Sequence, residues 1–352
     1  MNPASGHATR YHGPVKSRAR FVPVCLLAIV AAGFSSDKQV SGAAINRDLD
    51  RQAPRFAQSE SVLDHVDAQA VFVRGSHAFV AVGPQVVIVD ISDRMRPTVV
   101  GHSKAFSDSV QDVMVVDDLA YVAAGDSGLS VIDVSDASAP TVKGTYDSPG
   151  AASGIHVDGG RAYLADSWGG LQIVDVSDPR APSALGQVRI PRALAVQVVG
   201  HLAYVAAEEG GLRVIDVSDA TAPVEVGSYS AGGDVNGVAV MKNVAYLAAG
   251  GGGLEIVDVT RPTELQRVSG YTEPYGKRLH VVNGYVFLAT ERSGLWIIDI
   301  SSPADPVAVS RFDTIHSAND VYVDGPYAFV ATGRSGLRVI DTSNPETPVA
   351  LN

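Results

Sequence analysis

The sequence contains few of the residues and patterns that mark a disulfide-rich domain, a disordered chain or a membrane protein. Its 352 residues include one Cys, which excludes a disulfide framework and a multi-Cys zinc site. Charged residues make up 18%, below the roughly 25% of typical soluble domains, so disorder through excess charge is excluded. One long apolar run covers residues 21–34, and its 14 residues are too few to cross about 30 Å of hydrocarbon comfortably.

The same apolar run lies in a segment typical of an export signal. Four basic residues and no acidic residue occur within residues 1–36, and Ser35 and Ser36 follow the run. A basic region, a short apolar segment and a region of small residues form the pattern of a secretory signal peptide. We expect 1–36 to be a signal peptide with an approximate end, and a membrane anchor is the alternative. The mature chain would be exported, to the periplasm, the cell surface or the medium, without a stable membrane span.

The chain is acidic overall. It has 27 Lys and Arg against 38 Asp and Glu, a formal net charge of −11 at pH 7, and removal of the basic leader makes the remainder more acidic. No cluster of Lys and Arg occurs along it. Nucleic acids and anionic membranes are both bound through clustered basic residues, so we expect neither as a partner.

The strongest pattern is an internal repeat of about 42 residues. A short apolar segment that ends in Asp recurs seven times, with 41 to 43 residues between successive Asp residues. These segments are 86–90, 129–133, 171–175, 212–216, 254–258, 295–299 and 337–341. Each follows two segments rich in β-branched and aromatic residues and precedes a fourth extended segment, with Gly, Asp, Ser and Pro between them. No segment has a sustained period of 3.6 residues, which excludes a helical solenoid.

Seven units of four strands predict an all-β fold, a seven-bladed β-propeller with four antiparallel strands per blade, over residues 61–352. The third segment of each unit, such as 170–176, is apolar at nearly every residue, as expected for a strand packed on both faces. Because a single blade cannot bury both faces alone, the ring must close. Residues 37–60 form a polar linker, within which 54–59 is a candidate for a strand that closes the ring.

The third segment, which reads Leu-Gln-Ile-Val-Asp at 171–175, resembles the LVIVD repeat of exported bacterial and archaeal proteins. All seven copies share the resemblance, and the first departs most, with Val86 in place of Leu. The resemblance implies a β-propeller that lies on the cell surface or outside the membrane. It implies no reaction, because the family is defined by a structural strand and has no agreed catalytic motif. Neither a WD-type nor a kelch-type pattern is present.

An Asp ends the third segment in all seven units, as at Asp133 and Asp175. At a strand end, a carboxylate accepts hydrogen bonds from the backbone N–H groups of the following turn. We therefore interpret these residues as turn caps. A calcium loop is the alternative, because some units carry a second acid three residues later, as at Asp136, Asp178 and Asp219. Such a loop needs five or more oxygen ligands, whereas each of these turns supplies two carboxylates.

Residues that differ between the units are the candidates for function, because repeat proteins bind through divergent loops on one face. In a propeller, the loops between the second and third strands share a face with the links between blades. We expect the divergent polar residues to gather there, as a binding surface or as an ordinary solvated one. The candidates are Asp126, Asp166, Trp168, Arg192, Glu208, Glu209, Lys277, Arg278, Glu291, Arg292, His316, Asp320 and Arg334.

The sequence contains no motif of a hydrolase nucleophile, a zinc protease or a phosphate-binding loop. His156 and His280 occupy equivalent positions in their units and would offer, with His316, three imidazoles to a metal. The other units carry Phe, Met, Gln, Ala and Tyr at that position, which favours a packing role. We therefore expect no metal site and no cofactor.

Two functions agree with these observations. The leading hypothesis is a non-enzymatic exported propeller that binds a protein, a glycan or another envelope component through its divergent face. The alternative is a hydrolase or lyase with a polar-substrate site at the channel mouth. Its general acid or base would be one of His316, Asp112, Asp320 and Glu291, titrating near neutrality beside another polar group.

Overall fold

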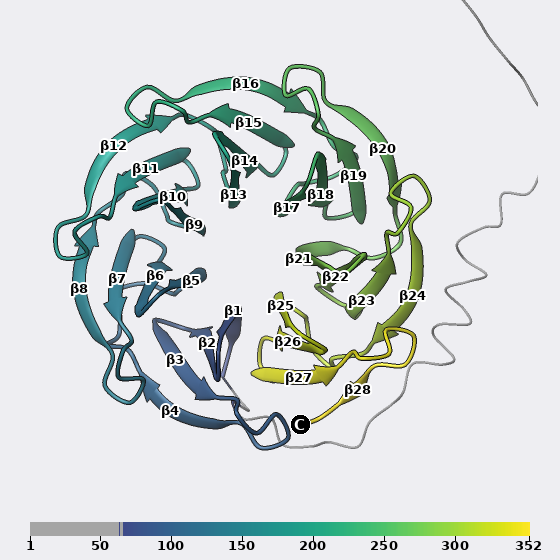
Figure 1. Ribbon diagram of the computed structural model, residues 1–352, viewed down its shortest axis with the longest axis horizontal. Helices are drawn as coiled ribbons and strands as arrows, with labels where there is room; N and C mark the ends of the chain where they lie inside the picture. The colour runs from purple at the N-terminus through teal and green to yellow at the C-terminus, as the bar shows by residue number, and fades with distance from the viewer. Residues whose placement is uncertain (1–62, 64–65) are drawn as a thin grey trace, which may run out of the picture. The chain divides into compact units, whose positions relative to one another are not determined.

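The computed structural model describes residue 63 and residues 66–352, so the expected leader and linker lie outside the described residues. Seven four-stranded antiparallel sheets are arranged in a ring around a central channel (Figure 1). The chain is therefore an all-β, seven-bladed propeller, as the repeat predicts. The described part of the chain contains no helix that is long and apolar enough to span a bilayer.

Each blade consists of four strands consecutive in sequence, the first nearest the channel and the fourth at the outer rim (Figure 1). The first three blades are β1 (Ala68–Arg74), β2 (His77–Val82), β3 (Gln85–Asp90), β4 (Thr98–His102); β5 (Asp112–Val116), β6 (Leu119–Ala123), β7 (Leu129–Asp133), β8 (Thr141–Tyr146); β9 (Gly154–Asp158), β10 (Arg161–Ala165), β11 (Leu171–Asp175), β12 (Ser183–Val188). The next two are β13 (Ala195–Val199), β14 (Leu202–Ala206), β15 (Leu212–Asp216), β16 (Val224–Tyr229); β17 (Gly237–Met241), β18 (Val244–Ala248), β19 (Leu254–Asp258), β20 (Gln266–Tyr271). The last two are β21 (Gly276–Val282), β22 (Tyr285–Thr290), β23 (Gly294–Asp299), β24 (Val307–Phe312); β25 (Asp320–Asp324), β26 (Tyr327–Ala331), β27 (Leu337–Asp341), β28 (Val349–Ala350).

The hydrophobic core lies between the blades. In β11 every residue is buried except Asp175 at its end. Leu171 and Ile173 pack with Val205 of the following blade, whereas Val174 packs into the cluster shared with the preceding blade. Alternate residues of one strand thus fill the cores on its two faces, and burial is complete only when the ring is closed.

The Asp residues that end the third strands cap the following turns in all seven blades. Each carboxylate accepts a hydrogen bond from the backbone N–H two residues later, at 2.7 to 2.9 Å. The hydroxyl and backbone N–H of Ser177 hold the pKa of the Asp175 carboxyl below its usual range. The acidic residue three positions after a capping Asp can cap a turn in the same way, since Asp136 accepts a hydrogen bond from Ser138 N. The turn-cap interpretation is confirmed.

The outer strands β4, β8, β12 and β16 pass very close to the turn of the next blade. An ideal Cβ on Gly144 of β8 would lie 2.5 Å from the carbonyl oxygen of Pro179. On Gly227 of β16, the corresponding distance to the oxygen of Pro262 would be 1.7 Å. Glycine removes these clashes, so the outer strand can contact the neighbouring blade directly.

Residues from both ends of the described chain complete the last blade. β28 pairs with only two residues of β27. Asn352 extends the pairing, because its Oδ1 accepts a hydrogen bond from Val339 N at 2.7 Å. Leu63 then lies against Gly336, where other blades place the carbonyl of an outer-strand residue. The candidate closing segment 54–59 lies outside the described residues, and within them Leu63 takes the position of an outer-strand residue.

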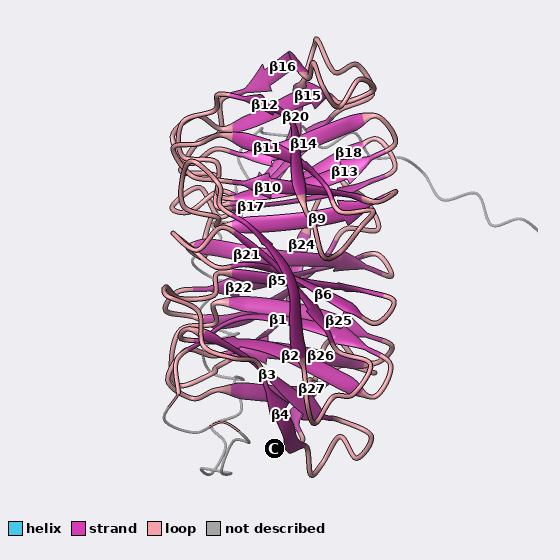
Figure 2. Ribbon diagram, turned by 90° about the vertical axis from the view of Figure 1, so that its left-hand side faces the viewer, coloured by secondary structure: helices cyan, strands magenta, loops and turns pink. Residues whose placement is uncertain are grey.

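One face of the ring carries loops that bridge neighbouring blades. The loop between the second and third strands pairs with the link entering the next blade, as in the two hydrogen bonds between Ser167 and Ala193 at 3.0 and 3.1 Å. The bridges are Gly125–Ala152, Ser167–Ala193, Glu208–Val235, Gly250–Gly276 and, across the ring closure, Ala68–Gly333. Because the strands are antiparallel, the hairpins between first and second strands lie at the opposite edge, and loops line both edges in the side view (Figure 2). We call the face that carries the bridging loops the bridged face.

Candidate functional site

The structure separates the predicted residues into three groups. Trp168, Arg192 and Glu208 form a cluster where the third and fourth blades meet on the bridged face. Lys277, Arg278 and Asp320 lie where the inner strands β21 and β25 begin, at one mouth of the channel. The remaining candidates belong to the loops between second and third strands and to the links between blades; they are Asp126, Asp166, Glu209, Glu291, Arg292, His316 and Arg334.

Trp168 is the most exposed large apolar residue in the described chain, with 66% of its surface accessible. The guanidinium of Arg192 lies over its ring, 5.6 Å from the centroid, and forms an ion pair with Glu208. The indole therefore has a basic group against it while most of its surface remains in solvent. By contrast, Trp296 is 2% exposed and belongs to the core. We call Trp168, Arg192 and Glu208 the Trp168 platform.

The backbone of the platform is strained. Ser167, Arg192 and Glu208 have φ values of 48°, 56° and 45°, in the left-handed region. A residue with a Cβ pays about 1 kcal/mol or more there, whereas glycine does not. Three other blades carry glycine in the position of Ser167 and Glu208, namely Gly125, Gly250 and Gly333. Strain of this kind is tolerated at functional sites, and it also occurs in the link before the last blade, where Ile315 has a φ of 66°.

Asp166 is fully buried and does not itself reach the bridged face. Its carboxylate accepts hydrogen bonds from Ser148 Oγ at 2.5 Å and from Gly150 N at 2.8 Å. It therefore fixes the loop that carries Trp168. His316 lies in the link before β25, with its Nδ1 2.7 Å from Ser335 Oγ, and not in the channel wall. Among the described residues, no three His, Cys, Asp or Glu side chains are arranged to hold a metal ion.

Arg278 crosses the mouth of the channel. Its side chain starts in the sixth blade and donates hydrogen bonds to the carbonyl oxygens of Ser153 at 3.0 Å and Leu194 at 3.5 Å, in the third and fourth blades. Its guanidinium also lies 3.6 Å from the carboxylate of Asp112, in the second blade. At the same level, four blades carry small residues that leave room for this side chain, namely Ala70, Gly154, Ala195 and Gly237.

Two carboxylates lie near this single guanidinium, and within the described chain only Asp112 forms an ion pair with it. Asp320 accepts a hydrogen bond from Val71 N at 3.0 Å, which joins the last blade to the first. Burial raises the pKa of the Asp320 carboxyl to about 6; Arg278 opposes this rise and Asp112 adds to it. Burial also raises the pKa of Asp112, against the effect of Arg278. Lys277 lies beside them, but its Nζ donates to Asn319 Oδ1 at 2.7 Å and burial lowers its pKa.

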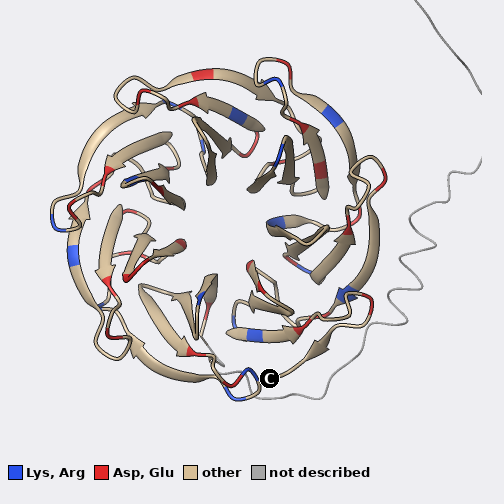
Figure 3. Cartoon of the chain, viewed as in Figure 1, with Lys and Arg blue, Asp and Glu red and all other residues tan. Residues whose placement is uncertain are grey.

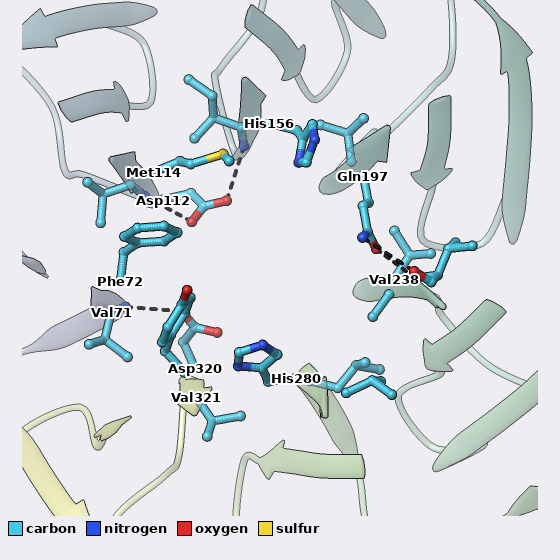
Figure 4. Close-up of a pocket in the computed structure, with 18 of the residues that line it drawn as sticks. Val71, Phe72, Asp112, Met114, His156, Gln197, Val238, His280, Asp320 and Val321 are labelled. Carbon is cyan, nitrogen blue, oxygen red and sulfur yellow. Dashed lines mark hydrogen bonds between the residues drawn. The ribbon is translucent and has the colours of Figure 1, made fainter. Parts of the chain in front are cut away.

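A cavity of about 330 Å³ occupies the channel below the mouth (Figure 4). Each inner strand contributes one residue to its wall at a common level; these are Phe72, Met114, His156, Gln197, Ala239, His280 and Tyr322. The ring of Tyr322 lies 4.8 Å from that of Phe72 and 4.7 Å from that of His280, between centroids. The sequence favours a packing role for this column, and the structure places it on the channel wall, where the Tyr322 ring contacts those of Phe72 and His280. A signal for this orientation exists in the sequence. Met114 and Tyr322 follow Asp112 and Asp320 by two residues on the same strand, so their side chains share a face with those acids.

Three wall residues also bind the next inner strand, and one of them is Met114, whose Sδ accepts a hydrogen bond from Val157 N at 3.2 Å. His280 Nδ1 accepts a hydrogen bond from Val323 N at 2.7 Å, and Gln197 Oε1 accepts one from Val240 N at 2.6 Å. These N–H groups lie on the inner edge of a blade, where no further strand can pair with them. Burial lowers the pKa of His280 to about 4, so at neutral pH its imidazole is uncharged and its Nδ1 is free to accept.

Comparisons with known proteins agree with this fold. The structure of the computationally designed Ika8 protein is similar with a TM-score of 0.60 and 11% identity, over 80% of this chain and 87% of that chain. The WD40 repeats of RRP9 are similar with a TM-score of 0.63 and 11% identity, over 81% and 99% of the two chains. At such identities the likeness shows the fold alone. No curated protein matches the sequence.

The repeat itself identifies the family. The LVIVD repeat matches seven consecutive segments, one for each blade. They are residues 66–104, 108–148, 149–189, 192–231, 232–273, 275–314 and 316–351. Together they include almost every residue that builds the ring, so the chain belongs to the LVIVD repeat family.

Proposed function

We propose that the protein is an exported, non-enzymatic binding module that holds a protein, a glycan or another envelope component on its bridged face. A ring of LVIVD repeats suits interaction, because the repeated residues build the blades and the divergent ones remain free in the loops. The leader pattern of residues 1–36 supports export, as does the resemblance to exported proteins.

The Trp168 platform is the observation that carries the proposal. An indole that is 66% exposed leaves apolar surface in water, and its burial by a partner would release roughly 1 to 2 kcal/mol. Trp and Arg are the residues most often found at the energetic centre of protein interfaces. Because Arg192 lies over Trp168 and is paired with Glu208, the platform is ordered before a partner arrives.

The charge distribution supports a protein or glycan partner. Lys and Arg are distributed around the ring and interspersed with Asp and Glu (Figure 3). A groove that tracks a phosphate backbone needs clustered Lys and Arg, which the sequence of this acidic chain does not offer. A partner that buries an aromatic ring and hydrogen-bonds to a few charged groups fits this surface better.

The test is the substitution Trp168→Ala in the exported chain. Immobilised protein captures components from the envelope fraction of the native cells, and each captured species is quantified by mass spectrometry. We expect the species enriched by the wild type to fall at least tenfold with Trp168→Ala, the loss typical of a central interface Trp. The thermal midpoint should stay within about 1 °C, because Trp168 contributes little to the core.

Met95→Ala is the matched control. Met95 is 65% exposed and lies in the turn between β3 and β4, on the face opposite the platform. This change should leave capture unaltered. Equal capture by wild type and Trp168→Ala, or an equal loss with Met95→Ala, would show that the platform is not the binding surface.

A further inference from the structure

The mouth of the channel holds two carboxylates, Asp112 and Asp320, and two cationic side chains, Arg278 and Lys277, both of which already donate hydrogen bonds to other acceptors. Asp112 lies 3.6 Å from the Arg278 guanidinium. Asp320 has no ion-pair partner within the described chain and is held by a hydrogen bond from a backbone N–H instead. The Arg278 guanidinium cannot neutralise both carboxylates, because it also donates hydrogen bonds to carbonyl oxygens on the far side of the channel.

The wall below the unpaired carboxylate is aromatic. Tyr322 follows Asp320 by two residues on β25, so both side chains face the channel. Phe72 and His280 flank the Tyr322 ring at 4.8 and 4.7 Å. Figure 4 shows Phe72, Asp320 and His280 around one side of the open space. A carboxylate above an aromatic wall is the environment that binds ammonium groups, through an ion pair and cation–π attraction.

We propose that the central channel is a binding site for a small organic cation, whose primary ammonium pairs with Asp320 and whose hydrocarbon lies along Tyr322 and Phe72. The cavity of about 330 Å³ is within the size range of small-molecule sites. His280 is uncharged at neutral pH and does not repel the ligand. The proposal concerns the channel alone and does not depend on the Trp168 platform.

The same features disfavour an anion. Arg278 already contacts three oxygen acceptors, and Lys277 Nζ donates to Asn319, so neither group is free for a ligand carboxylate or phosphate. An anion would also face Asp112 and Asp320 at the level where the cavity meets the mouth. Since Arg278 crosses that end, the ligand enters from the face that carries the hairpins between first and second strands.

Methionine methyl NMR tests the site, with n-butylammonium chloride as the probe at constant ionic strength. Met114 and Met241 line the cavity, whereas Met95 is exposed in a distant turn and serves as an internal reference. We expect the Met114 and Met241 methyl signals to shift in a saturable manner while that of Met95 stays fixed. The neutral 1-butanol and the anionic butyrate should bind at least tenfold more weakly. Absence of a saturable shift, or equal binding of 1-butanol, would overturn the proposal.

Asp320→Asn isolates the carboxylate. The amide oxygen still accepts from Val71 N, so the ring closure is retained while the charge is lost. We expect affinity for n-butylammonium to fall at least tenfold, and by several-fold with Tyr322→Leu. Asp305→Asn, which removes an exposed carboxylate in the turn between β23 and β24, should have no effect. Unchanged affinity in Asp320→Asn, with native circular dichroism, would refute the assignment.

The pH dependence gives a second readout. The groups that face Asp320 are Arg278, Asp112 and Lys277 at the mouth, with Tyr322 and His280 below. Because the pKa of Asp320 lies at about 6, acid removes the charge that the ammonium needs. Affinity should weaken by up to tenfold for each pH unit below about 6. In Asp320→Asn, the remaining Asp112 is neutralised by Arg278, so the dependence should largely disappear; an equal dependence in both proteins would exclude Asp320 as the group responsible.

Discussion

At the scale of single residues, ionised aspartate has opposite effects on stability at two kinds of position in this ring. Asp175 ends a strand in solvent, where Ser177 stabilises its ionised form and lowers its pKa. Asp320 faces a buried channel, where loss of water raises its pKa to about 6. A turn cap such as Asp175 stabilises the fold when ionised, whereas the ionised Asp320 opposes it.

This difference predicts that Asp320→Asn stabilises the protein at neutral pH. A carboxyl whose pKa is raised in the folded state stabilises the fold below its unfolded pKa of about 3.8, and that contribution is lost as pH rises through about 6. The variant should therefore match the wild type near pH 4 and exceed it at pH 7 by up to about 3 kcal/mol. Urea denaturation at both pH values measures the difference.

A stabilisation of equal size at pH 4 and pH 7 would instead indicate a packing effect. Asp136→Asn provides the opposite control. The Ser138 hydroxyl, followed by the Ser138 backbone N–H, lowers the pKa of Asp136, so its ionised form supports the fold. Its replacement should not stabilise the protein at pH 7, and any loss of stability should shrink as pH falls through the lowered pKa.

At the scale of elements, the inner strands leave backbone N–H groups without a strand partner. Each has a strand partner on one side and the channel on the other, so some N–H groups need acceptors from elsewhere. Side chains of the preceding blade supply them, as Gln197 does for Val240 and His280 does for Val323. These hydrogen bonds couple successive blades at the channel wall and let polar residues occupy a largely buried position.

His280→Ala should therefore destabilise the protein by about 1 to 2 kcal/mol, because Val323 N–H loses its acceptor and only channel water can replace it. His280→Asn places an oxygen where Nδ1 was and should restore most of the loss. His156 occupies the equivalent position, and the described residues offer it no hydrogen-bond partner, so His156→Ala should cost less. Urea denaturation at pH 7 ranks the three variants; equal losses for His280→Ala and His156→Ala would contradict the coupling.

At the scale of the whole molecule, the ring is joined by contacts between residues far apart in sequence. Asp320 accepts a hydrogen bond from Val71 N, and Asn319 Nδ2 donates to Ala68 O at 2.8 Å. Leu63 packs with Leu337 and other buried residues of the first and last blades. Because every core is shared between two blades, the seam between first and last blades stabilises all seven indirectly.

A chain that begins at Val66 should consequently melt several degrees below one that begins at residue 61. Only the longer chain retains Leu63, which is 9% exposed, and loss of a buried Leu costs about 2 to 3 kcal/mol. Circular dichroism melting of the two chains gives the comparison. Leu63→Ala in the longer chain should reproduce most of the effect, whereas identical melting of all three would show that Leu63 does not contribute to closure.

Much of the fold could be predicted from the sequence, because local patterns repeat seven times. The strand that ends in Asp175 and its six counterparts indicated the blades, and the antiparallel order indicated which loops share a face. The candidate site was predicted less completely. Trp168, Arg192 and Glu208 were each named, but their contact was not, since it requires two blades to be placed side by side.

Sequence by itself thus determined the architecture, the blade boundaries and the turn caps, because each depends on residues within one 42-residue unit or on the repetition of that unit. Only the tertiary structure decided that Asp166 is buried, that Arg278 reaches the third and fourth blades, and that Asp320 lacks an ion-pair partner in the described chain. These properties depend on distances across the channel or between neighbouring blades. Closure of the ring sets those distances, and no local pattern records them.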